Sequence, residues 1–142
     1  MRAEVALQWL SEGEGSVVSL VNGVATPAHG TPLLGLVAGL SRALEEEGLE
    51  RDLLHYGMPA LTRRRVMAGV SAVLSLDHPS PRYSTPSRLA LSSPDAQALF
   101  DQLVHRKARA LCREQPGLIE ALLTRALGQP VSPGASRGSQ AA

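Results

Sequence analysis

The chain has 142 residues and a formal net charge of +1, so its length fits one domain with a single hydrophobic core. A nearly neutral charge excludes a globally basic nucleic-acid-binding protein, so any such surface must come from local clusters of arginine. The single cysteine, Cys112, excludes a disulfide framework and a cysteine-based zinc site. The longest apolar stretch, residues 32–40, is too short to span a bilayer. We therefore expect a cytoplasmic protein with no membrane partner.

The N-terminal part of the sequence has the pattern of short β-strands. Asn22-Gly23 stands between two valine-containing runs, and an Asn-Gly pair supplies the positive φ angles of a type I′ turn. Upstream, apolar and polar residues alternate over residues 4–9 with the period of a half-buried strand, although one helical face also fits them. The sequence therefore predicts an N-terminal β-hairpin or a three-stranded meander.

Helix signals dominate the rest of the sequence. Thr31-Pro32 begins the first predicted helix, because threonine can cap free amides and proline suits the first helical position. That helix ends at Gly48, with Gly35 and Gly39 on one face. Further helices are predicted at residues 49–56, over residues 62–75, from 93 onward and between 116 and 128. We therefore expect four to five helices.

These elements predict an α+β fold, with the hairpin or meander packed on a mostly helical body. Residues 77–93 form a loop rich in proline and serine, with a short strand predicted at 89–91. We expect residues 1–128 to form a single compact domain. The composition of residues 129–142, mainly Pro, Ser, Gly and Ala, predicts a disordered C-terminal tail.

Three consecutive arginines, Arg63, Arg64 and Arg65, stand at the predicted start of a helix. The helix macrodipole disfavours each exposed cation there by roughly 0.3 to 1 kcal/mol, so the cluster needs a negative partner. One hypothesis is a bound phosphate, held by backbone amides, a hydroxyl and the guanidinium groups. The neighbouring loop would extend this nucleic-acid site through Arg82, Tyr83 and Arg88.

The second hypothesis is that the arginines pair with acidic residues of the same chain. A glutamate cluster lies at the C-terminal end of the preceding helix, where negative charge is also unfavourable: Glu45, Glu46, Glu47 and Glu50. Pairing would resolve both misplaced clusters at once, even though exposed pairs contribute only about 0 to 1 kcal/mol each. The sequence leaves both hypotheses open.

Two further basic residues, Arg106 and Lys107, complete the candidate nucleic-acid-binding set. They lie in the C-terminal half of the long helix, where cations also stabilise the helix dipole. The four histidines are scattered without metal-ligand spacing, and the sequence has neither a GxSxG elbow nor a GxxxxGK[ST] phosphate loop. We therefore predict no catalytic residue, no cofactor and no metal, and expect that the protein is not an enzyme.

One segment resembles a known family. The run Leu89-Ala-Leu-Ser-Ser-Pro-Asp-Ala-Gln-Ala-Leu-Phe100, with the basic helix up to residue 113, is similar to the closing segment of Bro-N domains of phage antirepressor-type proteins. That resemblance implies DNA binding. Our hypothesis is a small DNA-associated regulatory protein, a homodimer that contacts phosphates through arginine. The alternative is a helical adaptor or assembly protein that acts through protein–protein contacts.

Overall fold

The computed structural model describes residues 1–132 as an α+β fold. The strands are β1 (Arg2–Trp9), β2 (Val17–Val21), β3 (Val24–Ala25), β4 (His29–Gly30), β5 (Val70–Asp77) and β6 (Ala90–Leu91). The helices are α1 (Thr31–Glu50), α2 (Arg63–Val66), α3 (Pro94–Glu114) and α4 (Leu118–Leu127). The predicted fold class is confirmed, with N-terminal strands packed on a body of four helices among the described residues.

The predicted hairpin is formed by β2 and β3, which pair antiparallel around Asn22-Gly23. Both turn residues have positive φ, 51° at Asn22 and 79° at Gly23, as a type I′ turn requires. The Asn22 side chain also donates to the carbonyl of His78 at 3.0 Å and accepts from its backbone N–H at 2.9 Å. The turn is thereby fixed to the residue that follows β5.

The main sheet has the strand order β1-β5-β2-β3, so β5 lies between the two N-terminal strands. It pairs antiparallel with all of β1 and parallel with β2. The sequence predicted a helix over this segment, and that prediction is wrong beyond residue 66. The helix predicted at residues 49–56 is absent as well, since α1 ends at Glu50 and residues 51–56 are not helical. Gly69 has a φ of 72°, which ends the short α2, and β5 then buries every second residue. The apolar residues of this segment fit a period of two as well as a helical period, which caused the error.

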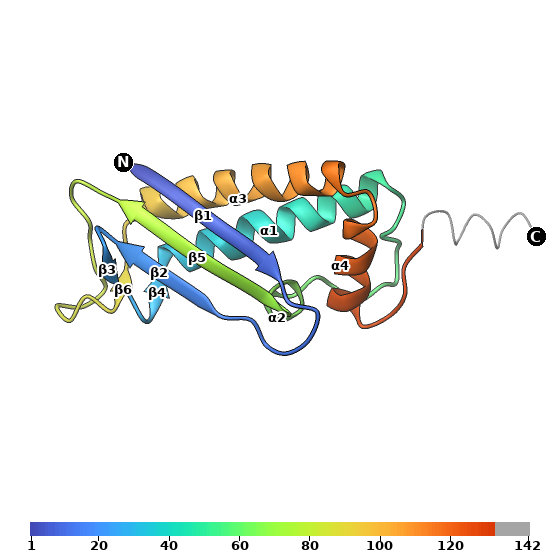
Figure 1. The fold of residues 1–142 in the computed structure, drawn as a ribbon, viewed down its shortest axis with the longest axis horizontal. Coiled ribbons are helices and arrows are strands. Elements are labelled where there is room, and N and C mark those ends of the chain that lie inside the picture. The colour runs from blue at the N-terminus through green and yellow to red at the C-terminus, as the bar shows by residue number, and fades with distance from the viewer. Residues whose placement is uncertain (133–142) are drawn as a thin grey trace, which may run out of the picture.

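Helices α1 and α3 run side by side across one face of the sheet (Figure 1). Gly35 and Gly39 of α1 allow this close approach, because a Cβ atom at either position would collide with the backbone of α3. The core between sheet and helices includes the fully buried Leu40, Leu74 and Phe100. The face of glycines noted in the sequence is therefore a helix–helix contact.

The N-terminus of α1 differs in detail from the predicted cap. Gly30, with a φ of 86°, occupies the capping position, and Thr31 is the first helical residue. The Thr31 hydroxyl is buried and has no hydrogen-bond partner among the described residues. Gly30 is needed because β4 pairs there with β6, and a Cβ would meet the backbone of Leu91.

Helix α4 closes the end of the molecule opposite the β3–β4–β6 end (Figure 1). It ends at Gly128, as predicted, where a φ of 69° gives a left-handed cap. The guanidinium of Arg125 donates to the carbonyl of Leu10, which ties α4 to the end of β1. None of the described helices is long and apolar enough to cross a bilayer. The tail prediction falls largely on residues 133–142, which lie outside the described residues.

Candidate functional site

Two of the predicted arginines, Arg63 and Arg64, line a surface cavity of about 510 Å³. They come from α2, whose start is fixed by Thr62, since its hydroxyl accepts from the Arg65 backbone N–H at 3.3 Å. Segments distant in the sequence complete the cavity, through Gly15, Ser16, Val17, His29, Leu33, Met67 and Val70. We call this cavity the arginine pocket.

His29 is the residue of the arginine pocket that the sequence analysis missed. Its Nδ1 lies 2.6 Å from the Ser19 hydroxyl, which in turn donates to the carbonyl of Thr26 at 3.0 Å. Partial burial lowers the pKa of His29, and the positive charge of Arg63 lowers it further. No local motif marks this histidine, because its partners come from β2 and α2. Only the folded chain places it beside the arginines.

The third arginine of the cluster, Arg65, lies elsewhere. Its Nη1 donates to the carbonyl of Ala126, near the C-terminus of α4, at 3.1 Å. A cation at that end of a helix is favourable, so this contact offsets the unfavourable place of Arg65 in α2. Arg65 therefore acts as a structural link between two helices.

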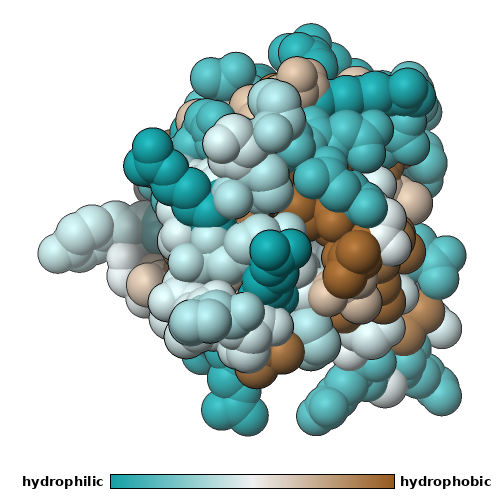
Figure 2. All heavy atoms as spheres, turned by 90° about the vertical axis from the view of Figure 1, so that its left-hand side faces the viewer, coloured by the Kyte–Doolittle hydropathy of each residue, from teal (hydrophilic) through white to brown (hydrophobic). Residues whose placement is uncertain are grey.

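The loop residues predicted to extend the site do not reach the arginine pocket. Arg82, Tyr83 and Arg88 are not among the residues that line it, although β6 at the end of the loop pairs with β4, which contains His29. The Arg88 guanidinium lies 5.5 Å from the centre of the Tyr83 ring, and the Arg82 backbone N–H donates to the Ser93 hydroxyl at 2.8 Å. Figure 2 faces the end of the molecule with this loop, where apolar side chains gather on one side of a mostly hydrophilic surface.

The loop is attached to the start of α3 by a histidine–carboxylate pair. His78 Nε2 lies 2.9 Å from a carboxylate oxygen of Asp95, and the His78 side chain is only 8% exposed. This hydrogen bond lowers the pKa of Asp95. Together with Ser80, Arg82, Ser93 and Pro94, the pair lines a second cavity of about 370 Å³.

Arg106 and Lys107 lie on α3 and do not line the arginine pocket. The Lys107 Nζ donates to the carbonyl of Val5 at the edge of β1, at 3.3 Å. Both side chains are otherwise exposed. The predicted nucleic-acid residues are thus distributed over α2, the β5–β6 loop and α3, rather than forming one surface.

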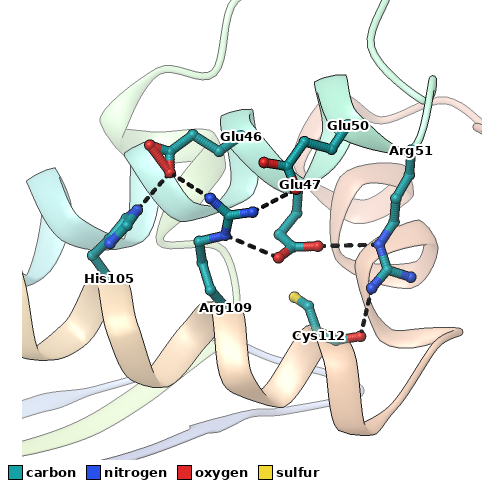
Figure 3. A network of polar contacts seen from close by, with 7 residues as sticks. All are labelled: Glu46, Glu47, Glu50, Arg51, His105, Arg109 and Cys112. Carbon is teal, nitrogen blue, oxygen red and sulfur yellow. Dashed lines mark hydrogen bonds and ion pairs between the residues drawn. The ribbon is translucent and has the colours of Figure 1, made fainter.

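Three of the four misplaced glutamates, Glu46, Glu47 and Glu50, form a charge network between α1 and α3 (Figure 3). Arg109 of α3 is its centre, with its guanidinium bonded to Glu46 at 3.1 Å, Glu47 at 3.0 Å and Glu50 at 2.5 Å. Glu47, only 2% exposed, also accepts from Arg51 Nε at 3.1 Å. Among the described residues, these carboxylates pair with cations of α1 and α3 and not with the arginine cluster.

The network shifts the protonation of its members. A hydrogen bond from His105, at 2.5 Å, lowers the pKa of Glu46, and Arg109 lowers it further. The bonds from Arg109 to Glu50 and Glu47 raise the pKa of its guanidinium. Burial, with the nearby charge of Glu47, raises the pKa of Cys112 to about 11. Cys112 is therefore a buried, protonated thiol, and the network stabilises the contact between the helices.

Among residues 1–132, no group of three or more His, Cys, Asp and Glu side chains is placed to hold a metal ion. The arrangement that stands out chemically is the arginine pocket, where cationic groups face a cavity with an apolar floor.

Comparison with known proteins finds one family. The family model for DNA gyrase B matches residues 1–138. The chain is 24% identical over 128 residues to the DNA gyrase B protein of Haloferax volcanii, with 89% of this chain and 20% of that protein covered. It is 27% identical over 128 residues to the DNA gyrase B protein of Synechocystis sp., of which it covers 12%. The chain therefore spans a fifth or less of the length of these relatives.

Solved structures have the same fold. The 43K ATPase domain of Thermus thermophilus gyrase B, in complex with an aminocoumarin, superposes with a TM-score of 0.81 at 23% identity, covering 98% of this chain and 37% of that chain. The topoisomerase IV ATP-binding domain of Francisella tularensis gives 0.79 at 18% identity, covering 89% of this chain and 34% of that chain. At these identities the likeness shows the fold alone.

These comparisons correct the resemblance drawn from residues 89–113. The matching family model describes DNA gyrase B, so the Bro-N interpretation is wrong. In the structure the segment is β6 followed by α3. A helix start at Ser-Pro-Asp before a basic amphipathic helix is a local pattern that unrelated folds share, so it does not identify a family.

The functional predictions are corrected as well. The comparisons support neither a small DNA-associated regulator nor a helical adaptor, since the relatives are DNA gyrase B proteins. The expectation that the protein is not an enzyme is also wrong, because the family model that matches residues 1–138 is that of DNA gyrase B. The error arose because the sequence has neither a GxSxG elbow nor a GxxxxGK[ST] loop, and the absence of these two motifs does not exclude other catalytic sites.

Proposed function

Because the chain belongs to the DNA gyrase B family, we propose that it forms part of the ATP-hydrolysing region of a topoisomerase that acts on DNA. One observation carries the proposal: 98% of the chain superposes on the Thermus thermophilus gyrase B ATPase domain with a TM-score of 0.81. The sequence match over residues 1–138 supports it independently.

The proposed role is that of a part and not of a complete ATPase. The chain corresponds to 37% of the Thermus domain and 34% of the Francisella domain. We infer that ATP hydrolysis requires the remaining portion of such a domain, and that this chain supplies a rigid α+β unit packed against it. The charge network between α1 and α3 supports rigidity, because buried paired charges fix one arrangement of two helices. A homodimer and a cytoplasmic location belong to the same proposal.

A chimeric ATPase tests this function. In the chimera, residues 1–128 of this chain replace the structurally matched segment of the Thermus thermophilus 43K ATPase domain. We expect a folded chimera to hydrolyse ATP faster than a Thermus domain from which the same segment is deleted. The matched control carries Glu47→Gln in the grafted segment and should lose activity at a lower temperature, because that change weakens the α1–α3 contact. A folded chimera with no more activity than the deletion would contradict the proposal.

The second part of the proposed function is contact with DNA. We propose that the exposed arginines Arg82, Arg88 and Arg106 contact the DNA phosphates. The expected result is binding of a labelled duplex that weakens between about 50 and 200 mM salt, because arginine–phosphate contacts release counterions. Fluorescence anisotropy measures it. Replacing these three arginines with glutamine should weaken binding and reduce the salt dependence.

The matched control for DNA binding is Arg42→Gln. Arg42 is already paired with Asp101 at 2.5 Å, so its loss should leave DNA binding nearly unchanged. Equal affinity of the triple variant and the wild-type protein for the duplex would show that these three arginines do not bind DNA. If the wild-type protein does not bind the duplex at low salt, the proposal that this chain contacts DNA is wrong.

A further inference from the structure

The arginine pocket differs from the charge network between α1 and α3 in having cations without counter-ions. Arg63 and Arg64 form neither an ion pair nor a side-chain hydrogen bond with any described residue. Arg51 and Arg109, by contrast, each bond to glutamates. Two neighbouring guanidinium groups that face one cavity repel each other, so an anion placed between them would gain from both.

His29 adds a third polar group to the lining of the arginine pocket. Its Nδ1 is occupied by the Ser19 hydroxyl, which fixes the ring and leaves Nε2 as the nitrogen that can meet a ligand. Arg63 lies close enough to His29 to disfavour protonation of the ring. An anion bound beside His29 and Arg63 would instead favour protonation of the His29 ring.

The number of donors selects the kind of anion. One guanidinium fork satisfies both oxygens of a carboxylate, whereas a phosphoryl group presents three terminal oxygens. Two guanidinium groups and one imidazole therefore match a phosphoryl group better than a carboxylate. The floor of the cavity is apolar, formed by Val17, Leu33, Met67 and Val70, so it favours an apolar body attached to the phosphate.

We propose that the arginine pocket binds a small phosphate monoester, with its phosphoryl group held by Arg63, Arg64 and His29 and its apolar body on the floor formed by Val17, Leu33, Met67 and Val70. The site does not depend on the proposed ATPase role, because it rests on residues of this chain alone. It also differs from the predicted nucleic-acid surface, since Arg65 and the loop arginines are not part of it.

The experiment is a titration of the isotope-labelled chain followed by NMR at the His29 ring and the Val17 and Leu33 methyl groups. The probes are phenyl phosphate, inorganic phosphate and benzoate. We expect saturable shifts with phenyl phosphate at all three residues and a rise in the pKa of His29. Inorganic phosphate should bind more weakly because it lacks the apolar body, and benzoate more weakly because it lacks the third oxygen.

The variants test which residues hold the phosphoryl group. Arg63→Gln combined with Arg64→Gln should weaken phenyl phosphate binding at least about tenfold, the effect of losing roughly one charge-assisted contact. Arg113→Gln, an exposed change on α3, is the matched control and should bind like the wild-type protein. Thermal unfolding of each variant verifies its fold before binding is compared.

Four outcomes would overturn the proposal, and the first two need only the wild-type protein. Phenyl phosphate could leave the His29, Val17 and Leu33 signals unchanged, or benzoate could bind as tightly as phenyl phosphate. The double variant could keep wild-type affinity. A short DNA duplex could shift these signals when phenyl phosphate does not, which would make the pocket a contact for the DNA backbone.

Discussion

The glutamate cluster at the end of α1 and the arginine cluster at the start of α2 both lie at unfavourable helix ends, but their surroundings differ in the folded chain. Glu46, Glu47 and Glu50 at the end of α1 form ion pairs with cations at the α1–α3 contact, chiefly with Arg109. Arg63 and Arg64 at the start of α2 meet no acidic side chain among residues 1–132 and face a cavity instead. A charged cluster at the unfavourable end of a helix therefore predicts an oppositely charged partner. It does not predict whether that partner is a side chain of the same chain or a ligand.

The difference arises from which elements lie beside each cluster. Helix α3 runs along α1 and carries Arg109 and His105 on its facing side (Figure 3). The arginines of α2 lie beside β2, β4 and the start of β5, and the residues that those segments contribute to the cavity are apolar or neutral. One cluster thus stabilises the fold, and the other is available for a ligand.

The largest expected effect is at Glu47, the most buried member of the charge network. Glu47→Gln should lower the free energy of unfolding by about 3 kcal/mol, because it leaves two guanidinium groups partly unpaired inside the helix contact. Chemical denaturation measures this value. Glu50→Gln, at the exposed edge of the same network, is the control and should cost less than about 1 kcal/mol. Equal losses for both variants would show that burial does not strengthen the network.

Gly39→Ala tests whether close approach of the helices is what pairs the acidic cluster. The new Cβ would collide with the Asp101 backbone of α3, so we expect a loss of about 2 kcal/mol in the free energy of unfolding. The matched control is Gly117→Ala, because a Cβ at Gly117 meets no atom within 4 Å. A Gly39→Ala protein as stable as the control would mean that α1 and α3 can separate without loss.

The pH dependence of stability should carry a contribution from Glu46. Its pKa is lowered from 4.5 in the folded chain, so the unfolded state binds more protons in the acid range. The stabilisation is therefore present above about pH 4.5 and is lost as the pH falls through the lowered pKa. Denaturation curves of the wild-type protein and Glu46→Gln should differ at pH 6 and converge toward about pH 3. A difference that stays constant with pH would contradict this assignment.

The smallest stability effect is expected in the arginine pocket. Arg63→Gln should change the free energy of unfolding by no more than about 0.5 kcal/mol, since no contact of that side chain is lost. It should nevertheless raise the pKa of His29 toward 6.5 without reaching it, because burial is the larger cause of the lowering. NMR titration measures this pKa. Arg106→Gln should leave the pKa of His29 unchanged. An unchanged pKa in Arg63→Gln would show that the charge of Arg63 does not act on His29.

Several elements were predictable because their signals are local. The Asn22-Gly23 turn, the start of α1 next to Pro32 and the end of α4 at Gly128 depend on backbone angles that few residues favour. The segment after Gly69 was not predicted, since its apolar residues fit a helix and a strand equally. Its place in the middle of the sheet, between β1 and β2, decided in favour of a strand.

The arginine pocket was predictable only in part. Consecutive charge identified Arg63 and Arg64, but the sequence grouped them with Arg65, Arg82 and Arg88, which the structure places elsewhere. It omitted His29, because the contact between that residue and α2 exists only after the strands assemble. Nor could a chain that spans part of a larger domain reveal its family through a catalytic motif.

By itself, the sequence determined the fold class, the hairpin, the starts of α1 and α3, the end of α4 and the presence of two charge clusters at unfavourable helix ends. The tertiary structure alone decided which cluster is paired, because pairing depends on the elements that lie within a few ångströms. Local backbone preferences act between neighbours in the chain, whereas charges interact through space. The arginines at the start of α2 therefore became a cationic pocket only when β2, β4 and β5 were placed around them.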